Sequence, residues 1–234
     1  MNAIVTMLCD RDAALYPLHR ESLEDVWPAD TEYFISADKD NPPVGIKYET
    51  THLFNSPTRP GERVSIPQHA RSVMKAMDDV RKMCPEADYI IRMDADCIHL
   101  DSEWFFGAVE EKRHPLVGFS QNSRPSAAYG AAMAIRADVV EKLAELPFDI
   151  TMRESPGEDT VLSDQVRKEY PNGLFLHGLY KDCKLNDWRR FRGWDGPETN
   201  YQKHQVIHLG QKVDREAGEE ILSNMKLVWN DRNG

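Results

Sequence analysis

Short apolar runs alternate with longer amphipathic segments through the first two thirds of the chain. The apolar runs, some rich in β-branched residues, predict strands at residues 3–8, 32–36, 89–93 and 129–136. Apolar residues at helical spacing predict helices over residues 16–26, 65–84, 139–146 and from 158 to about 170. This alternation predicts an α/β fold, Rossmann-like, with a mixed, mainly parallel sheet flanked by helices.

Two of these helices are expected to start at a capping box, in which side chains at the first and fourth positions bond each other's backbone N–H groups. The pairs are Ser65 with Gln68 and Asp138 with Glu141. Apolar residues on one face after Lys212 predict a final helix.

Two carboxylates, Asp94 and Asp96, follow the third predicted strand. Side chains alternate along a strand, so both are predicted on one side, where they would repel unless a cation or hydrogen-bond donors intervened. Mg²⁺ and Mn²⁺ suit such oxygen ligands, whereas a solvated acidic turn is the alternative for a bare Asp-x-Asp. An EF-hand is excluded, because Ile98, His99 and Phe105 stand where its loop needs an oxygen ligand, a glycine and a glutamate.

Polar clusters follow three of the predicted strands, at residues 9–12, 37–40 and 94–96. Parallel α/β sheets bind ligands outside the carboxyl ends of their strands. We therefore expect these clusters to line one edge of the sheet together.

Composition restricts the classes of function. The formal net charge of −10 opposes non-specific attraction to polyanions but leaves room for a local basic groove. Four cysteines without a Cys-x-x-Cys pair favour reduced thiols and no zinc site. The sequence has no basic leader and no uncharged run long enough to span a bilayer, so a soluble, cytoplasmic protein without membrane insertion is expected.

Glu158 and Asp159 are expected in the first turn of the helix that carries Leu162, Val166 and Tyr170 on one face. Carboxylates there favour the helix dipole, which explains an acidic first turn without any chemistry.

Taken in order, the motifs resemble those of the GT-A fold, metal-dependent glycosyltransferases. The segments are DADC (94–97), YGAAMAIRADVVEKL (129–143), PFDITMRESPGEDTVLSDQV (147–166) and VIHLG (206–210). The resemblance covers residues 1 to about 210 and is strongest from 88 to 167. It implies a single catalytic domain over 1–234. Its parts would be a nucleotide-sugar-binding half (1–100), an acceptor half (101–212) and a C-terminal helix (213–234).

The resemblance also implies a metal site and a base. Asp96 would be the main carboxylate on Mn²⁺ or Mg²⁺, and Asp94 would bind the metal or the donor ribose. His208 would be the C-terminal metal ligand, with His177 as a rival. Asp159, or else Glu158, would face the acceptor hydroxyl as the base of an inverting transfer.

Donor contacts are implied at strand ends and at the start of the second predicted helix. These residues are Arg11, Asp38, Gln68, Arg71 and Asp94. A UDP-sugar is the default donor for this fold, although no residue here specifies uridine.

A basic and aromatic segment, KDCKLNDWRRFRGW (181–194), stands out in this acidic chain. Its candidate phosphate or acceptor contacts are Trp188, Arg189, Arg190, Arg192 and Trp194. It would cover the donor diphosphate or bind an anionic acceptor, including a nucleic acid such as hydroxylated DNA. A helix edge with its aromatic residues in the core and its arginines in solvent is the structural alternative.

The expected function is transfer of a hexosyl or pentosyl group from a nucleotide-sugar to a hydroxyl of a glycan or another acceptor. It would take place in the cytoplasm, or in the host cytoplasm for a viral protein. A nucleotidyltransferase is disfavoured, because residues 8–12 lack the glycine of a phosphate loop. A non-catalytic module that binds a sugar nucleotide is the third alternative.

Overall fold

The computed structural model describes residues 1–8, 15–24, 30–37, 52–55, 66–99, 103–121, 124–147, 157–182 and 206–208. The strands are β1 (Asn2–Met7), β2 (Thr31–Ala37), β3 (His52–Asn55), β4 (Tyr89–Asp94), β5 (Cys97–His99), β6 (Leu116–Gln121), β7 (Arg124–Arg136), β8 (Leu174–Asp182) and β9 (Val206–His208). The helices are α1 (Tyr16–Glu24), α2 (Ile66–Met83), α3 (Glu103–Glu110), α4 (Ala137–Glu145) and α5 (Glu158–Glu169). The expected final helix lies outside the described residues.

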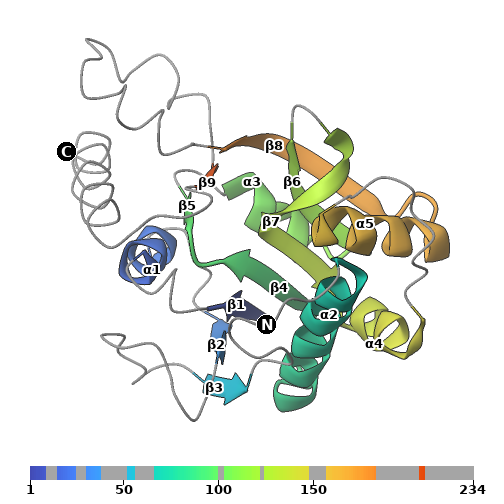
Figure 1. The fold of residues 1–234 in the computed structure, drawn as a ribbon, viewed down its shortest axis with the longest axis horizontal. Helices are drawn as coiled ribbons and strands as arrows, with labels where there is room; N and C mark the ends of the chain where they lie inside the picture. Colours follow the sequence, from blue (N-terminus) through green and yellow to red (C-terminus); the bar gives the residue numbers. More distant parts are fainter. Residues whose placement is uncertain are drawn as a thin grey trace.

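The described strands form one mixed sheet in the order β3-β2-β1-β4-β7-β6-β8-β9-β5 (Figure 1). Strands β3, β2, β1 and β4 are mutually parallel, as are β6, β8 and β9. The β4–β7, β6–β7 and β5–β9 pairs are antiparallel. The predicted α/β fold with a mixed, mainly parallel sheet is therefore confirmed.

Helices cover both faces of this sheet, because successive strand residues point to opposite sides. In β1, Ile4 packs in the core beneath α1 and α3, while its neighbours Ala3 and Val5 pack with α2, α4 and α5. Ile91 and Ile90 of β4 divide between the same two cores. Strands buried on both faces read as continuous apolar runs, which explains why they were recognisable in the sequence.

The register of the parallel strands brings their carboxyl ends to one edge. Met7, the last residue of β1, lies opposite Ser36 of β2 and Asp94 of β4. The described ends of these strands thus share one edge, as expected, although residues 9–12 and 38–40 are outside the described part of the chain.

Two details of the sequence prediction are wrong. Helix α4 begins at Ala137, and its N-cap residue Arg136 makes no side-chain capping bond, so Asp138 does not act as a cap. Asp138 instead accepts hydrogen bonds from the Arg136 guanidinium, at 2.6 and 2.9 Å, within the first turn. Asp94 and Asp96 also do not share a strand, because the chain turns between β4 and β5. Ser65 of the other capping box lies outside the described residues.

None of the helices in the described part of the chain combines the length and the hydropathy that crossing a membrane requires.

Replacing Gly118 by alanine is expected to destabilise the protein by about 1–3 kcal/mol, because overpacking a tight core forces its neighbours to shift. A Cβ at Gly118, in β6, would lie 2.5 Å from the Cβ of Ala128 in β7. Gly107, on α3, has no atom within 4 Å of such a Cβ, so Gly107→Ala is the matched control and should be neutral or stabilising. Urea unfolding of both variants checks this, and equal stabilities would contradict it.

Candidate functional site

The candidate site is centred on the turn between β4 and β5 at the carboxyl edge of the sheet. Strand β4 ends at Asp94, residues 95 and 96 form the turn, and β5 begins at Cys97. A carboxylate oxygen from each of Asp94 and Asp96 and the Cys97 sulfur all lie within 4.8 Å of one another, close enough to surround one cation. The predicted proximity of the two carboxylates is therefore seen, although a turn and not strand alternation produces it.

Cys97 fits this turn as a thiol and not as a metal ligand. It is fully buried, and its sulfur lies 4.0 Å from Asp96 Oδ1, to which it donates. Burial, with the nearby Asp96 and Asp94 carboxylates, raises the pKa of the thiol well above its ordinary value. A neutral thiol is a poor ligand for Mg²⁺ or Mn²⁺, so the oxygen atoms are the donors to consider. Cys97 and Cys84 are both free thiols.

Arg92 is the main site residue that the sequence analysis did not single out. Its side chain, 3% exposed, ion-pairs with three carboxylates. Nη1 donates to Asp159 Oδ1 at 2.5 Å, and Nη2 donates to Asp94 Oδ1 at 2.9 Å and to Glu158 Oε1 at 3.0 Å. The signal was present as a single charge within the apolar run YIIRM, because a fully buried arginine needs partners.

Arg92 thereby joins the two acidic motifs, which are far apart in the sequence. Glu158 and Asp159 occupy the first turn of α5, as predicted, after the N-cap residue Gly157. Burial alone would raise the pKa of Glu158, but the charges of Arg92 and His69 outweigh it and lower that pKa. His69 Nδ1 of α2 lies 3.7 Å from Glu158 Oε2. The acidic pair is therefore anchored to the sheet edge beside Asp94, a contact that helix-dipole stabilisation does not explain.

His208 reaches the same turn through the backbone. It is the last residue of β9 and lies directly opposite Cys97 in the antiparallel β5–β9 pair. Its backbone is thus next to that of the residue after Asp96. His177 lies in β8, opposite Phe119 of β6, and β9 lies between β8 and β5 in the strand order.

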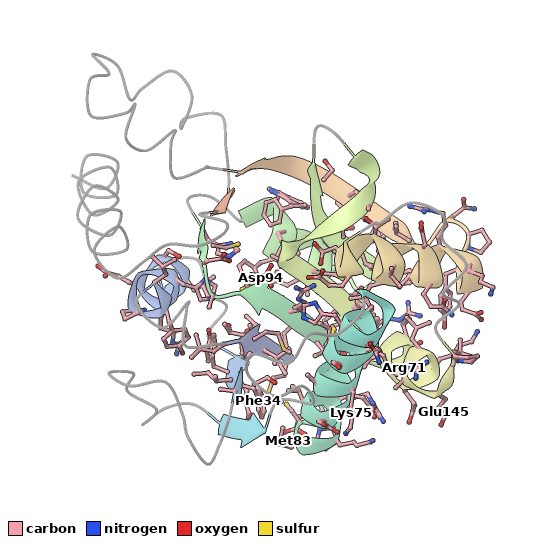
Figure 2. All side chains as sticks on the ribbon, in the orientation of Figure 1. Phe34, Arg71, Lys75, Met83, Asp94 and Glu145 are labelled. Atoms are coloured by element: carbon pink, nitrogen blue, oxygen red, sulfur yellow. The ribbon has the colours of Figure 1, made fainter. Side chains whose placement is uncertain are left out.

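The predicted donor residues divide between described and undescribed parts of the chain. Gln68 and Arg71 are exposed on α2. Figure 2 shows Arg71 well separated from Asp94, which lies at the end of β4. Arg11 and Asp38 lie outside the described residues, as does the basic and aromatic set, Trp188, Arg189, Arg190, Arg192 and Trp194.

A buried polar network lies behind the turn, on the side of α1. His19 Nδ1 is 2.7 Å from the Cys97 carbonyl oxygen, and His19 Nε2 is 3.4 Å from Thr6 Oγ1. Thr6 Oγ1 is in turn 2.5 Å from the Tyr33 hydroxyl. Burial lowers the pKa of His19 to about 4, against small opposing effects of the Cys97 carbonyl and the Asp96 charge. The imidazole is therefore neutral at neutral pH.

This neutral histidine predicts a dependence of stability on pH. The pKa of His19 is 6.5 in the unfolded chain and about 4 in the fold. Only the unfolded chain therefore takes up the proton between these values, so the free energy of unfolding falls as pH falls from 6.5 to 4. The loss attributable to His19 is roughly 3 kcal/mol, fully reached below pH 4. Urea unfolding from pH 8 to 4 should show this slope in the native protein but not in His19→Asn. The same slope in both would contradict the prediction.

Comparison with known proteins shows a likeness in fold to solved structures. No protein-family model matches the chain, and no curated protein matches it. Among solved structures, the fold is similar to the crystal structure of a glycosyltransferase involved in the glycosylation of the major capsid of PBCV-1. The TM-score is 0.54 at 10% sequence identity, over 93% of this chain and 98% of that one. At this identity, the comparison shows that the chain has the fold of a glycosyltransferase.

Proposed function

We propose that this protein is a metal-dependent glycosyltransferase of the GT-A type, which moves a hexosyl or pentosyl group from a nucleotide-sugar to a hydroxyl acceptor. The observation that carries this is the pair of carboxylates, Asp94 and Asp96, at ligand distance at the carboxyl edge of a sheet. This is the edge where α/β folds bind their ligands. The likeness in fold to a glycosyltransferase supports it.

Asp96, Asp94 and His208 are the residues that would hold the divalent cation. Two carboxylates and an imidazole are a donor set that Mn²⁺ accepts, and Mg²⁺ accepts the carboxylates. When bound, the cation would supply Lewis-acid neutralisation of the charge that develops on the leaving diphosphate. Arg92 already neutralises part of the charge of Asp94, so this carboxylate would be shared between the guanidinium and the cation.

In the proposed transfer, the bond between sugar C1 and the diphosphate oxygen breaks, and its electron pair leaves with the nucleoside diphosphate. The acceptor oxygen attacks C1 from the opposite face, which inverts the configuration, and its proton passes to Asp159. Arg92 orients the Asp159 carboxylate through the 2.5 Å contact. Proton transfer to Asp159 would occur as the new bond forms. Glu158, held by Arg92 and His69, is the alternative base.

The donor is proposed to be a UDP-sugar, bound along the edge formed by β1, β2 and the start of α2. Asp38, Arg11, Gln68 and Arg71 are the proposed contacts. The segment 181–194 is proposed to contact the donor phosphates or the acceptor. The comparison lends no support to a nucleic acid as acceptor, so a glycan or another hydroxyl compound is preferred.

The test is release of the nucleoside diphosphate from a panel of UDP-, GDP- and dTDP-sugars, and of the monophosphate from CMP-sugars, with Mn²⁺, Mg²⁺ or EDTA and mixed glycan acceptors. Mn²⁺-dependent release from one donor class is expected, and the anomeric configuration of the product reports inversion. Release of pyrophosphate from a nucleoside triphosphate and a sugar phosphate would favour a nucleotidyltransferase. Binding of a sugar nucleotide without any turnover would favour a binding module.

A further inference from the structure

Helix α1 is fastened to the short strand β5 by buried hydrogen bonds on one helical turn. His19 Nδ1 contacts the Cys97 carbonyl oxygen at 2.7 Å. Ser22 Oγ donates to the His19 carbonyl oxygen at 2.7 Å and accepts from the His99 backbone N–H at 3.1 Å. All four residues are at most 1% exposed. Both ends of β5 are therefore tied to α1, which lies alongside it in Figure 1.

The hydrogen bonds of His19 fix the orientation of its ring. A carbonyl oxygen only accepts, so Nδ1 carries the proton, and Nε2 of the neutral ring accepts from the Thr6 hydroxyl at 3.4 Å. The Tyr33 hydroxyl lies 2.5 Å from Thr6 Oγ1 and completes the chain as a donor. The ring also packs against His99, with centroids 5.8 Å apart. The orientation of the imidazole is thus fixed by hydrogen bonds at both ring nitrogens and by the contact with the His99 ring.

The carbonyl that His19 holds belongs to the residue after Asp96 and opposite His208. Strand β5 has only three residues, so few contacts of its own define its place. A shift of Cys97 would move the Asp96 carboxylate relative to Asp94 and change the register with β9. We propose that His19 is a positioning residue for the divalent-cation site, acting through the Cys97 carbonyl; this rests on the cation site of the proposed function.

Packing alone would not call for a histidine at this place. A somewhat larger phenylalanine would keep a flat ring at this place without the cost of burying two polar nitrogens. What the imidazole adds is a directed hydrogen bond to the turn. Groups that orient metal ligands by hydrogen bonds, without binding the metal themselves, contribute about 10- to 100-fold to metal affinity.

The test is Mn²⁺ binding, measured by the loss of the free-ion electron paramagnetic resonance signal at 25 °C. His19→Phe is expected to weaken binding by about 10- to 100-fold. His19→Asn, whose amide nitrogen takes the place of Nδ1, should bind within about threefold of the native protein, whereas His19→Gln, which reaches toward Thr6 instead, should be weakened like His19→Phe. Leu23→Ala is the matched control, because Leu23 is fully buried one turn further along α1 and makes no contact of this kind. It should lower stability but leave Mn²⁺ affinity within about threefold of native.

The outcomes separate this proposal from the proposed function. If the native protein binds Mn²⁺ and Asp96→Asn does not, the cation site stands, and native affinity in His19→Phe would then overturn the positioning role alone. If His19→Phe does not fold, equal affinities of His19→Asn and His19→Gln overturn it. If the native protein does not bind Mn²⁺, or binds it equally well after Asp96→Asn, the cation site fails and the positioning role with it.

Discussion

Replacing Asp96 by asparagine is expected to lower metal-dependent cleavage of the sugar nucleotide by about a thousandfold. A bound cation contributes several kcal/mol to charge stabilisation on the leaving group, and each 1.36 kcal/mol is a factor of about ten in rate. Asp96 is 8% exposed and lies within 4.8 Å of the Asp94 carboxylate, so it is the buried member of the proposed cation site. Asparagine keeps the shape of the side chain but removes the charge that would attract the ion.

The loss should appear in binding as well as in turnover. Native protein at a Mn²⁺ concentration of about 100 times the dissociation constant should gain roughly 2.7 kcal/mol of stability, and Asp96→Asn should gain almost none. In EDTA the variant should be at least as stable as the native protein, because one of two neighbouring carboxylates no longer repels the other.

Glu145→Gln is the matched control, since it removes one carboxylate from an exposed position on α4 that Figure 2 shows to be remote from Asp94. It should change neither turnover nor Mn²⁺ binding. Full activity of Asp96→Asn would show that the carboxylate pair is an acidic turn without a role in metal binding.

The parts of this fold that the sequence predicted are those with local signals. Strands β1, β2 and β4 are short apolar runs, and helices α2 and α5 have one apolar face. Each of these elements can therefore be recognised from roughly a dozen residues of sequence. The position of Asp94 at a strand end and of Glu158 in a first turn follow from the same patterns. The common edge of the parallel strands then follows from topology.

The parts that were missed depend on contacts between distant segments. Arg92 pairs with Glu158 and Asp159, which are more than 60 positions away in the sequence. A local sequence pattern cannot identify which distant residue will pair with a buried charge. Strand β5 has three residues, and among the described strands its pairing partner is β9, more than 100 positions away. A strand that short is defined by its partner and by α1, so it carries no periodicity of its own. His19 was overlooked because its role depends on that pairing.

Removing the Arg92 guanidinium is expected to cost about 3–5 kcal/mol of unfolding free energy, the largest effect on stability predicted for a single substitution in this protein. Arg92→Met keeps an unbranched apolar stem but removes the guanidinium that Asp94, Glu158 and Asp159 share. Urea unfolding at pH 7.5 in EDTA measures this cost. Arg113→Met is the matched control, because Arg113 is 76% exposed and pairs with Glu111, which is 56% exposed, and such surface pairs contribute about 0–1 kcal/mol.

Asp159→Asn tests whether Arg92→Met loses unfolding free energy for electrostatic reasons or because of packing. In the native background this substitution removes a partner of a buried guanidinium and should destabilise the protein. In the Arg92→Met background it removes one of three neighbouring carboxylate charges that have lost the guanidinium, and it should stabilise the protein. The expected coupling energy between the two substitutions is about 1–3 kcal/mol. The effect of one substitution therefore changes sign with the state of Arg92. If Asp159→Asn destabilises both backgrounds equally, the Arg92 contacts contribute packing alone, and the carboxylates would not depend on Arg92 for their charge balance.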